Sequence, residues 1–175
     1  IANRANEMLG GTKGNYEYVH PLDHVNFGQS SNDDIQTAGK IAAIRMSKKL
    51  LVELKKLQNA LNDKKEEYAE ILRIGRTHLQ PASPMTFYQA FEAYSFTIQK
   101  DIKRIESALN GMYDLNMGAN LIGSGLKTDT KYAKKVVFYI SKYTGEDFKL
   151  AKNLIDTTYN LDGFLALSGA IRVLA

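Results

Sequence analysis

Cysteine and tryptophan are absent from the 175 residues of this sequence, and only three prolines occur. Without cysteine, neither a disulfide bond nor a thiolate metal site can form, and the composition fits a reducing, cytoplasmic environment. The scarcity of proline argues against a loop-rich disordered chain. No stretch approaches the roughly 20 apolar residues that a membrane-spanning helix needs, so we expect no membrane partner.

A strong excess of charge of one sign is also lacking. Lysine and arginine number 23 against 19 acidic residues, a net charge of +4, and the signs alternate along the chain. This small surplus suits an anionic small molecule and does not favour nucleic acid as a partner. With 44% hydrophobic residues, the chain can bury a core, so we expect a single helical domain over residues 1–175. Because a helical pattern already runs at both ends, we expect this domain to be truncated at both ends.

Helical periodicity dominates the sequence. Apolar residues spaced by three and four predict helices over residues 1–9, 31–74, 84–112, 129–143 and from about 156 to the end. Ser31 or Asn32 would cap the second of these helices, and Pro84 would open the third, where its missing N–H costs nothing. Gly75 and Gly145 would stop two of them. No alternating pattern typical of a β-hairpin is evident, so we expect an all-α fold.

The predicted length of the helix over residues 31–74 has a consequence for assembly. About 40 residues make a rod of roughly 60 Å, whereas a compact globule of this chain length has a radius of gyration of about 16 Å. An apolar stripe on such a rod needs other helices to cover it. The alternative is two shorter helices kinked near residues 64–68. We predict an oligomeric bundle of long helices.

Three polar loops interrupt the helical pattern, over residues 10–32, 75–80 and 118–126, and all three histidines fall in them. In the middle loop, Thr77 can donate to a carboxylate, and His78 can bind an anion or move a proton. The alternative is a hydrophilic surface turn. In the first loop, the small polar side chains of residues 29–33 stand at a helix start, where N–H groups favour an anion, although capping alone would also explain them.

The first loop also holds His20, Asp23 and His24, whose side chains a metal could use. No further ligand occurs at a spacing typical of zinc. We therefore expect no metal site and interpret the segment as a turn shaped by Pro21, with the Asp23 side chain bonded to nearby backbone.

The order of several motifs resembles that of the aspartase/fumarase superfamily. The resemblance rests on segments in fixed order over the whole chain: IANRANE at residues 1–7, HPLDHVN at 20–26, QSSND at 29–33, GRTHLQ at 75–80, GA at 118–119, IGSGL at 122–126 and SGA at 168–170. It implies the central helical domain of that superfamily and a homotetramer. It also implies reversible elimination from a succinate-type backbone, without a cofactor.

The resemblance further implies roles for particular residues. Ser30, Ser31 and Asn32 would contact a dicarboxylate substrate. Thr77 and His78 would do so as well and would act in catalysis. His20 and Asp23 match a secondary anion-binding loop of fumarases, although Leu22 stands where the family usually has asparagine. Related enzymes build each site from three subunits.

The stretch over residues 153–158 is more similar to aspartases than to fumarases, so we expect L-aspartate as the substrate and fumarate with ammonia as products. Hydration of fumarate to malate is the alternative, and a non-catalytic helical scaffold is the contrasting class. The family's Gly-Ser-Ser loop, which carries the catalytic serine base, does not occur among these residues. We therefore expect the 175 residues alone to be inactive.

Overall fold

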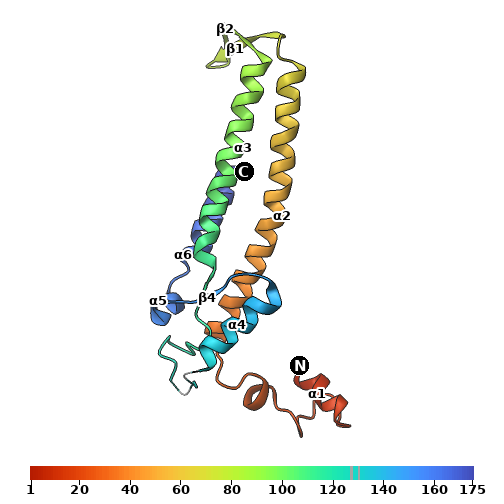
Figure 1. Ribbon diagram of the computed structural model, residues 1–175, viewed down its shortest axis with the longest axis vertical. Helices are drawn as coiled ribbons and strands as arrows, with labels where there is room; N and C mark the ends of the chain where they lie inside the picture. The colour runs from red at the N-terminus through yellow and green to blue at the C-terminus, as the bar shows by residue number, and fades with distance from the viewer. Residues whose placement is uncertain (127, 130) are drawn as a thin grey trace. The chain divides into compact units, whose positions relative to one another are not determined.

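The computed structural model describes residues 1–126, 128–129 and 131–175. The elements, in chain order, are α1 (Ala2–Met8), η1 (Pro21–Val25), α2 (Ser31–Glu67), β1 (Leu72–Thr77), β2 (Gln80–Thr86), α3 (Phe87–Leu109), η2 (Asn110–Met112), β3 (Asp114–Leu115), α4 (Tyr132–Thr144), β4 (Lys149–Leu150), α5 (Leu154–Tyr159) and α6 (Asp162–Leu174). The helical fold class is confirmed (Figure 1).

The contacts divide the chain into two compact units. The first comprises Ile1–Lys40 and Tyr113–Leu161, and the second comprises Ile41–Met112 and Asp162–Ala175. Within the described residues, no helix is both long and apolar enough to cross a bilayer.

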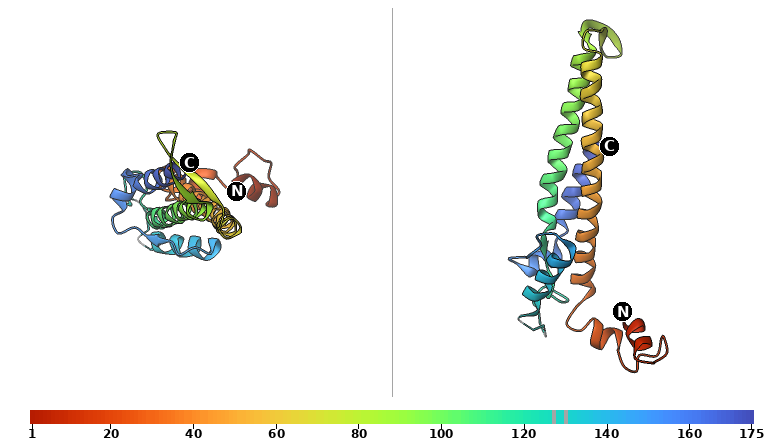
Figure 2. Two further views of the ribbon diagram at one scale, coloured as in Figure 1. Left: turned by 90° about the horizontal axis from the view of Figure 1, so that it is seen from above. Right: turned by 45° about the vertical axis from the view of Figure 1, so that its right-hand side comes forward.

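The second unit is built on long antiparallel helices. After the hairpin of β1 and β2, α3 runs back beside α2 (Figures 1 and 2), and Ser95 Oγ donates to Asn62 Oδ1 at 2.7 Å between them. The helix α6 packs against α3. A Cβ added to Gly163 would lie 3.0 Å from the Gly111 carbonyl oxygen, so the absence of a side chain permits this close approach. The most buried apolar residues of the unit are Ile44, Leu54, Ile102, Ile105, Leu109, Met112 and Leu167.

The buried face of α2 differs from the predicted apolar stripe. The helix is continuous over 37 residues and ends at Glu67, not at Ile74. Its buried residues alternate in spacing between four and three and include polar members: Asp33, Thr37, Lys40, Ile44, Ser47, Leu51 and Leu54. Two apolar residues of the helix that follow the three- and four-residue spacing, Ile35 and Leu57, are exposed. Hydropathy alone misplaced the stripe because the buried face begins with three polar residues, Asp33, Thr37 and Lys40.

The prediction that no hairpin occurs was wrong. β1 and β2 pair antiparallel, with Thr77 opposite Gln80, so the expected loop over residues 75–80 is the turn and inner part of a hairpin. Pro84 pairs with Ile74 within β2 and does not open a helix. In a two-stranded sheet each strand has a free edge, which tolerates a residue without an N–H.

The helix predicted to begin at Pro84 is α3, and it begins at Phe87, because Thr86 and Gln89 form a capping box. Thr86 Oγ1 accepts the Gln89 N–H at 3.2 Å, and Gln89 Oε1 accepts the Thr86 N–H at 3.0 Å. The two bonds satisfy N–H groups that would otherwise be unpaired at the helix start.

The turn of the hairpin holds two non-glycine residues in the left-handed region, His78 at φ 47° and Leu79 at φ 64°. Leu79 is also 88% exposed, so its side chain offsets little of the conformational cost. We expect Leu79→Asn to raise the free energy of unfolding by about 1 kcal/mol, because asparagine tolerates this backbone region better. Urea unfolding measures the change. Leu72→Asn, at an exposed strand position, is the control and should give no gain.

The first unit surrounds the parallel pair of β3 and β4. Its buried apolar residues include Ala2 on α1 and residues of β3, the following loop, α4 and the segment around β4: Leu115, Met117, Ala119, Val137, Phe148 and Ala151. Gly145 ends α4 at φ 73°, as predicted. The expected last helix is two helices, since Asn153 caps α5 and the chain is extended at Asn160 before α6.

Candidate functional site

The residues Ser30, Ser31 and Asn32 lie at the N-terminal end of α2. Ser30 provides the cap, where Ser31 or Asn32 had been expected: its Oγ accepts the Asn32 N–H at 3.2 Å, and its carbonyl accepts the Asp33 N–H at 3.1 Å. Ser30 is buried, whereas Ser31 and Asn32 are exposed. The exposed pair is therefore positioned at the positive end of the α2 dipole, where an anion is favoured.

Asn32 is held by the loop that follows β3. Its Nδ2 donates to the Leu121 carbonyl at 2.6 Å. Below it, the fully buried Asn116 donates through Nδ2 to the Asn32 carbonyl and to Thr158 Oγ1, each at 3.1 Å. Because Nδ2 faces a carbonyl oxygen, the Asn32 amide has one orientation, and its Oδ1 is the acceptor left for a ligand.

The Asp33 carboxylate lies beneath this arrangement and is fully buried. Its Oδ1 accepts the Ser30 N–H at 2.9 Å. Its Oδ2 accepts the N–H groups of Gly118 and Asn120, both at 3.1 Å. The start of α2 is therefore joined to the glycine-containing loop through one carboxylate.

This carboxylate and its neighbour shape the local electrostatics. Burial, together with the charge of Asp33, raises the pKa of Asp34. Burial and then the charges of Asp33 and Asp34 raise the pKa of the Tyr132 phenol to about 12. Burial is the larger cause of both pKa shifts, and the negative charge of Asp33 adds to each.

Stability should consequently fall at high pH through Tyr132. Its pKa in the folded chain is about 12, above the ordinary value of 10.0, so the unfolded state releases the proton first and gains stability as pH rises from about 10 to 12. We expect a loss of about 1 kcal/mol over this interval, because the ring is only partly buried, and a smaller loss in Tyr132→Phe. Urea unfolding at pH 9, 10, 11 and 12 measures it, and equal losses in both proteins would contradict it.

Thr77 and His78 lie at the tip of the hairpin, on β1 and its turn. Both are exposed, and Arg76 Nη1 donates to the Leu79 carbonyl at 3.3 Å across the turn. Ser30, Ser31 and Asn32 belong to the first unit, and Thr77 and His78 belong to the second. The structure therefore describes two separate groups of the predicted substrate residues, each within its own unit.

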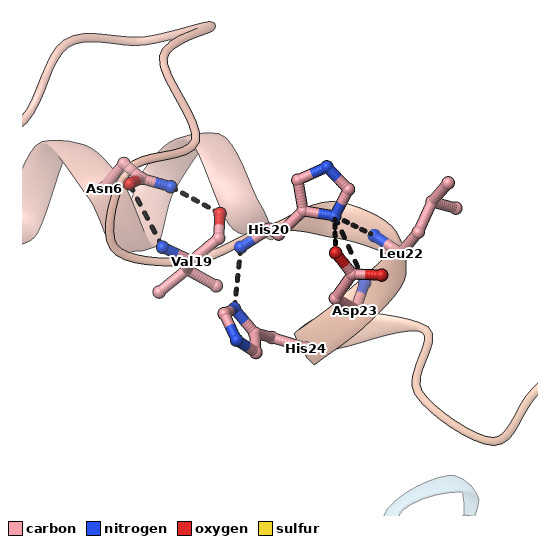
Figure 3. A network of polar contacts seen from close by, with 6 residues as sticks. All are labelled: Asn6, Val19, His20, Leu22, Asp23 and His24. Atoms are coloured by element: carbon pink, nitrogen blue, oxygen red, sulfur yellow. Dashed lines mark hydrogen bonds and ion pairs between the residues drawn. The ribbon is translucent and has the colours of Figure 1, made fainter.

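His20 and Asp23 are brought together at the turn η1, which also contains His24 and corrects the expectation that no histidine lies in a helical element. His20 Nδ1 lies 3.1 Å from Asp23 Oδ2. The same atom accepts the N–H groups of Leu22 and Asp23, and His24 Nδ1 accepts the His20 N–H at 2.9 Å (Figure 3).

These contacts bear on the secondary anion loop. The N–H groups of Leu22 and Asp23, which an anion would use, are directed to His20 Nδ1, and the Asp23 carboxylate adds negative charge beside them. Pro21 is the first residue of η1, in line with the predicted turn, but His20 Nδ1, and not the Asp23 side chain, accepts the backbone N–H groups. Among the described residues, no group of three or more His, Asp or Glu side chains is placed to hold a metal ion.

The sequence analysis did not identify three residues that support Ser30 and Asn32 at the start of α2: Asp33, Asn116 and Thr158. For Asp33 a signal existed, because the segment from Ser30 to Asp33 has the form of a capping box, with an acidic residue three positions after the cap. For Asn116 and Thr158 no local pattern is available, since their bonds connect segments far apart in the chain.

Comparison with known proteins gives one family for the whole chain. The sequence profile of a family described as lyase matches residues 1–175. An aspartate ammonia-lyase of a Bacillus species is 41% identical over 99% of this chain and 37% of its own length. A mitochondrial fumarate hydratase of Mus musculus is 43% identical over 100% of this chain and 35% of its own length. The chain thus spans a little over a third of these relatives.

Solved structures agree with this result. A fumarate lyase described as delta crystallin from Brucella melitensis, bound to cobalt, superposes with a TM-score of 0.94 at 34% identity, over 99% of this chain and 38% of that one. A class II fumarase from Schistosoma mansoni has a TM-score of 0.91 at 31% identity, over 99% and 40% of the two chains.

Proposed function

Because this chain belongs to the lyase family, with aspartate ammonia-lyases and fumarate hydratases among its relatives, we propose that it is the central helical part of a lyase that eliminates ammonia from L-aspartate to give fumarate. The observation that carries the proposal is the exposed Asn32 side chain at the start of α2, with its Nδ2 bound to Leu121 and its Oδ1 left as an acceptor. The ammonium group of aspartate can donate to that oxygen, as can the hydroxyl of malate, so the preference for aspartate rests on the resemblance of residues 153–158 to aspartases.

The remaining roles follow from the chemistry of the reaction. Elimination beside a carboxylate passes through a doubly charged, enediolate-like state, so donors fixed around the developing charge lower the barrier. Ser30 and Ser31 at the positive end of α2 would bind one carboxylate. Thr77 would donate to the other, and His78 would bind the substrate and take part in proton transfer. We propose these roles from the family resemblance and the exposure of Thr77 and His78.

We further propose that the lyase is a homotetramer in which different subunits supply the two groups of substrate residues. The resemblance to enzymes that build each site from three subunits supports this arrangement. The second unit supports assembly with large exposed apolar side chains on its three helices: Met46, Val52, Leu57, Tyr94, Phe96, Leu165 and Val173. Light scattering at micromolar concentration tests it; a monomer at every concentration would refute the tetramer.

We propose a cytoplasmic location, since the chain contains no cysteine. We also propose that the serine base of the reaction lies in a segment outside these residues. The 175-residue chain alone should then show no turnover, since loss of a positioned base costs about 10²- to 10⁴-fold in rate.

The test follows fumarate absorbance with the full-length polypeptide that carries this sequence. L-Aspartate and L-malate are supplied separately, and the aspartate reaction should be the faster. Faster turnover of malate would favour the second candidate, fumarate hydratase, which the 43% identity to the Mus musculus protein supports. Turnover of neither substrate would leave the non-catalytic scaffold as the better description.

A further inference from the structure

The carboxylate of Asp33 is fully buried in the first unit and has no cationic side chain among its described hydrogen-bond partners. Three backbone N–H groups replace a counter-charge, one from Ser30 at the start of α2 and two from the loop after β3, Gly118 and Asn120. Burying an ionised carboxylate is unfavourable unless such donors surround it. The arrangement therefore stabilises one relative placement of the helix start and the loop.

The loop in turn controls a substrate-binding side chain. Asn120, whose N–H bonds to Asp33, directly precedes Leu121, whose carbonyl accepts Asn32 Nδ2 at 2.6 Å. Asn120 is also at φ 62°, so a bond at its N–H helps to hold a backbone conformation that is otherwise unfavourable. A continuous series of contacts thus leads from the Asp33 carboxylate to the orientation of the Asn32 amide.

We infer that Asp33 is a positioning residue: by binding the Gly118 and Asn120 N–H groups, it places the Leu121 carbonyl so that Asn32 presents Oδ1, and not Nδ2, to the substrate. This inference rests on the proposed function, because it assigns Asn32 to the amino group of the substrate. It predicts that Asp33 contributes to discrimination between ligands that do and do not carry an amino group.

The test uses Asp33→Asn in the full-length polypeptide, with L-aspartate and succinate as ligands. Asparagine keeps the size but turns an NH₂ group toward one of the amide donors. We expect the Kd for aspartate to rise about 10-fold or more, the effect of losing a hydrogen bond to a charged group, while the Kd for succinate changes by less than about 3-fold. Equal weakening of both ligands, or no weakening, would overturn the inference.

Asp34→Asn is the matched control. It removes a carboxylate from the same helical turn. Among the described contacts, the loop N–H groups donate to Asp33 and not to Asp34, so the Kd values for aspartate and for succinate should be unchanged. Hydrogen exchange gives an activity-independent readout. In Asp33→Asn the Gly118 and Asn120 amides should exchange at least about 10-fold faster, while Val137 on α4 stays protected; unchanged exchange at the two loop amides would refute the positioning role.

A second variant covers the case in which Asp33→Asn does not fold. Asn32 is exposed, so Asn32→Ala should fold normally, and it should weaken aspartate binding selectively. Equal loss of aspartate and succinate would contradict the assignment of Oδ1 to the amino group. If the unsubstituted protein binds no aspartate, the proposed function fails, whereas the exchange experiment still decides whether Asp33 holds the loop.

Discussion

Gly123→Ala should reduce the free energy of unfolding by about 2–5 kcal/mol. A Cβ at this position would lie 2.4 Å from Ile155 Cα and 2.8 Å from the Leu154 carbonyl oxygen, so the loop and the start of α5 would have to separate. Overpacking of this kind costs roughly 1–3 kcal/mol. In addition, φ is +88°, where an L side chain adds about 1–2 kcal/mol.

Gly14→Ala separates the two contributions. Gly14 belongs to the same unit and also has a φ of +88°, but a Cβ there meets nothing within 4 Å. Only the backbone cost of about 1–2 kcal/mol should remain. Urea unfolding of both variants, followed by circular dichroism, gives the comparison. Equal destabilisation of the two variants would show that a methyl group at position 123 fits against α5 at no steric cost, which would contradict the prediction.

The long helices were predictable because their pattern is repeated many times, whereas the hairpin was not. In β1 only Arg73 and Gly75 are even partly buried, so its apolar side chains give no clear alternation between core and solvent. The strand forms by pairing with β2, from Leu72 opposite Thr86 to Thr77 opposite Gln80 next to the turn. A weak local pattern stabilised by a partner strand is not visible in a single segment.

Residue types at the site were predictable, but their contacts were not. Ser31 and Asn32 could be placed at a helix start from their capping tendency. The bond from Asn32 to Leu121 connects positions 89 residues apart, and the burial of Asp33 depends on amides from that same distant loop. Such bonds follow from the tertiary fold, so no periodicity or spacing in the sequence indicates them.

His78→Ala should lower kcat/KM for L-aspartate by about 10²- to 10⁴-fold in the full-length polypeptide, the usual effect of removing a group that transfers protons or stabilises developing charge. His78 is exposed at the hairpin turn, at φ 47°, so its side chain is accessible to a substrate. With few contacts inside its own unit, this side chain has little structural role there, so the loss should appear in the reaction and not in folding. Fumarate absorbance measures the rate.

Two further variants separate chemistry from backbone conformation. Asparagine accepts the positive φ of this turn and keeps a hydrogen-bonding side chain, but it cannot take up or release a proton near neutral pH. His78→Asn should therefore fold as well as the unsubstituted protein and still lose about 10²-fold or more in rate. His24→Ala, which removes an exposed histidine of η1 in the other unit, should keep most of the activity. If His78→Asn retained full kcat/KM, hydrogen bonding alone would account for His78, and proton transfer would have to be assigned to another residue.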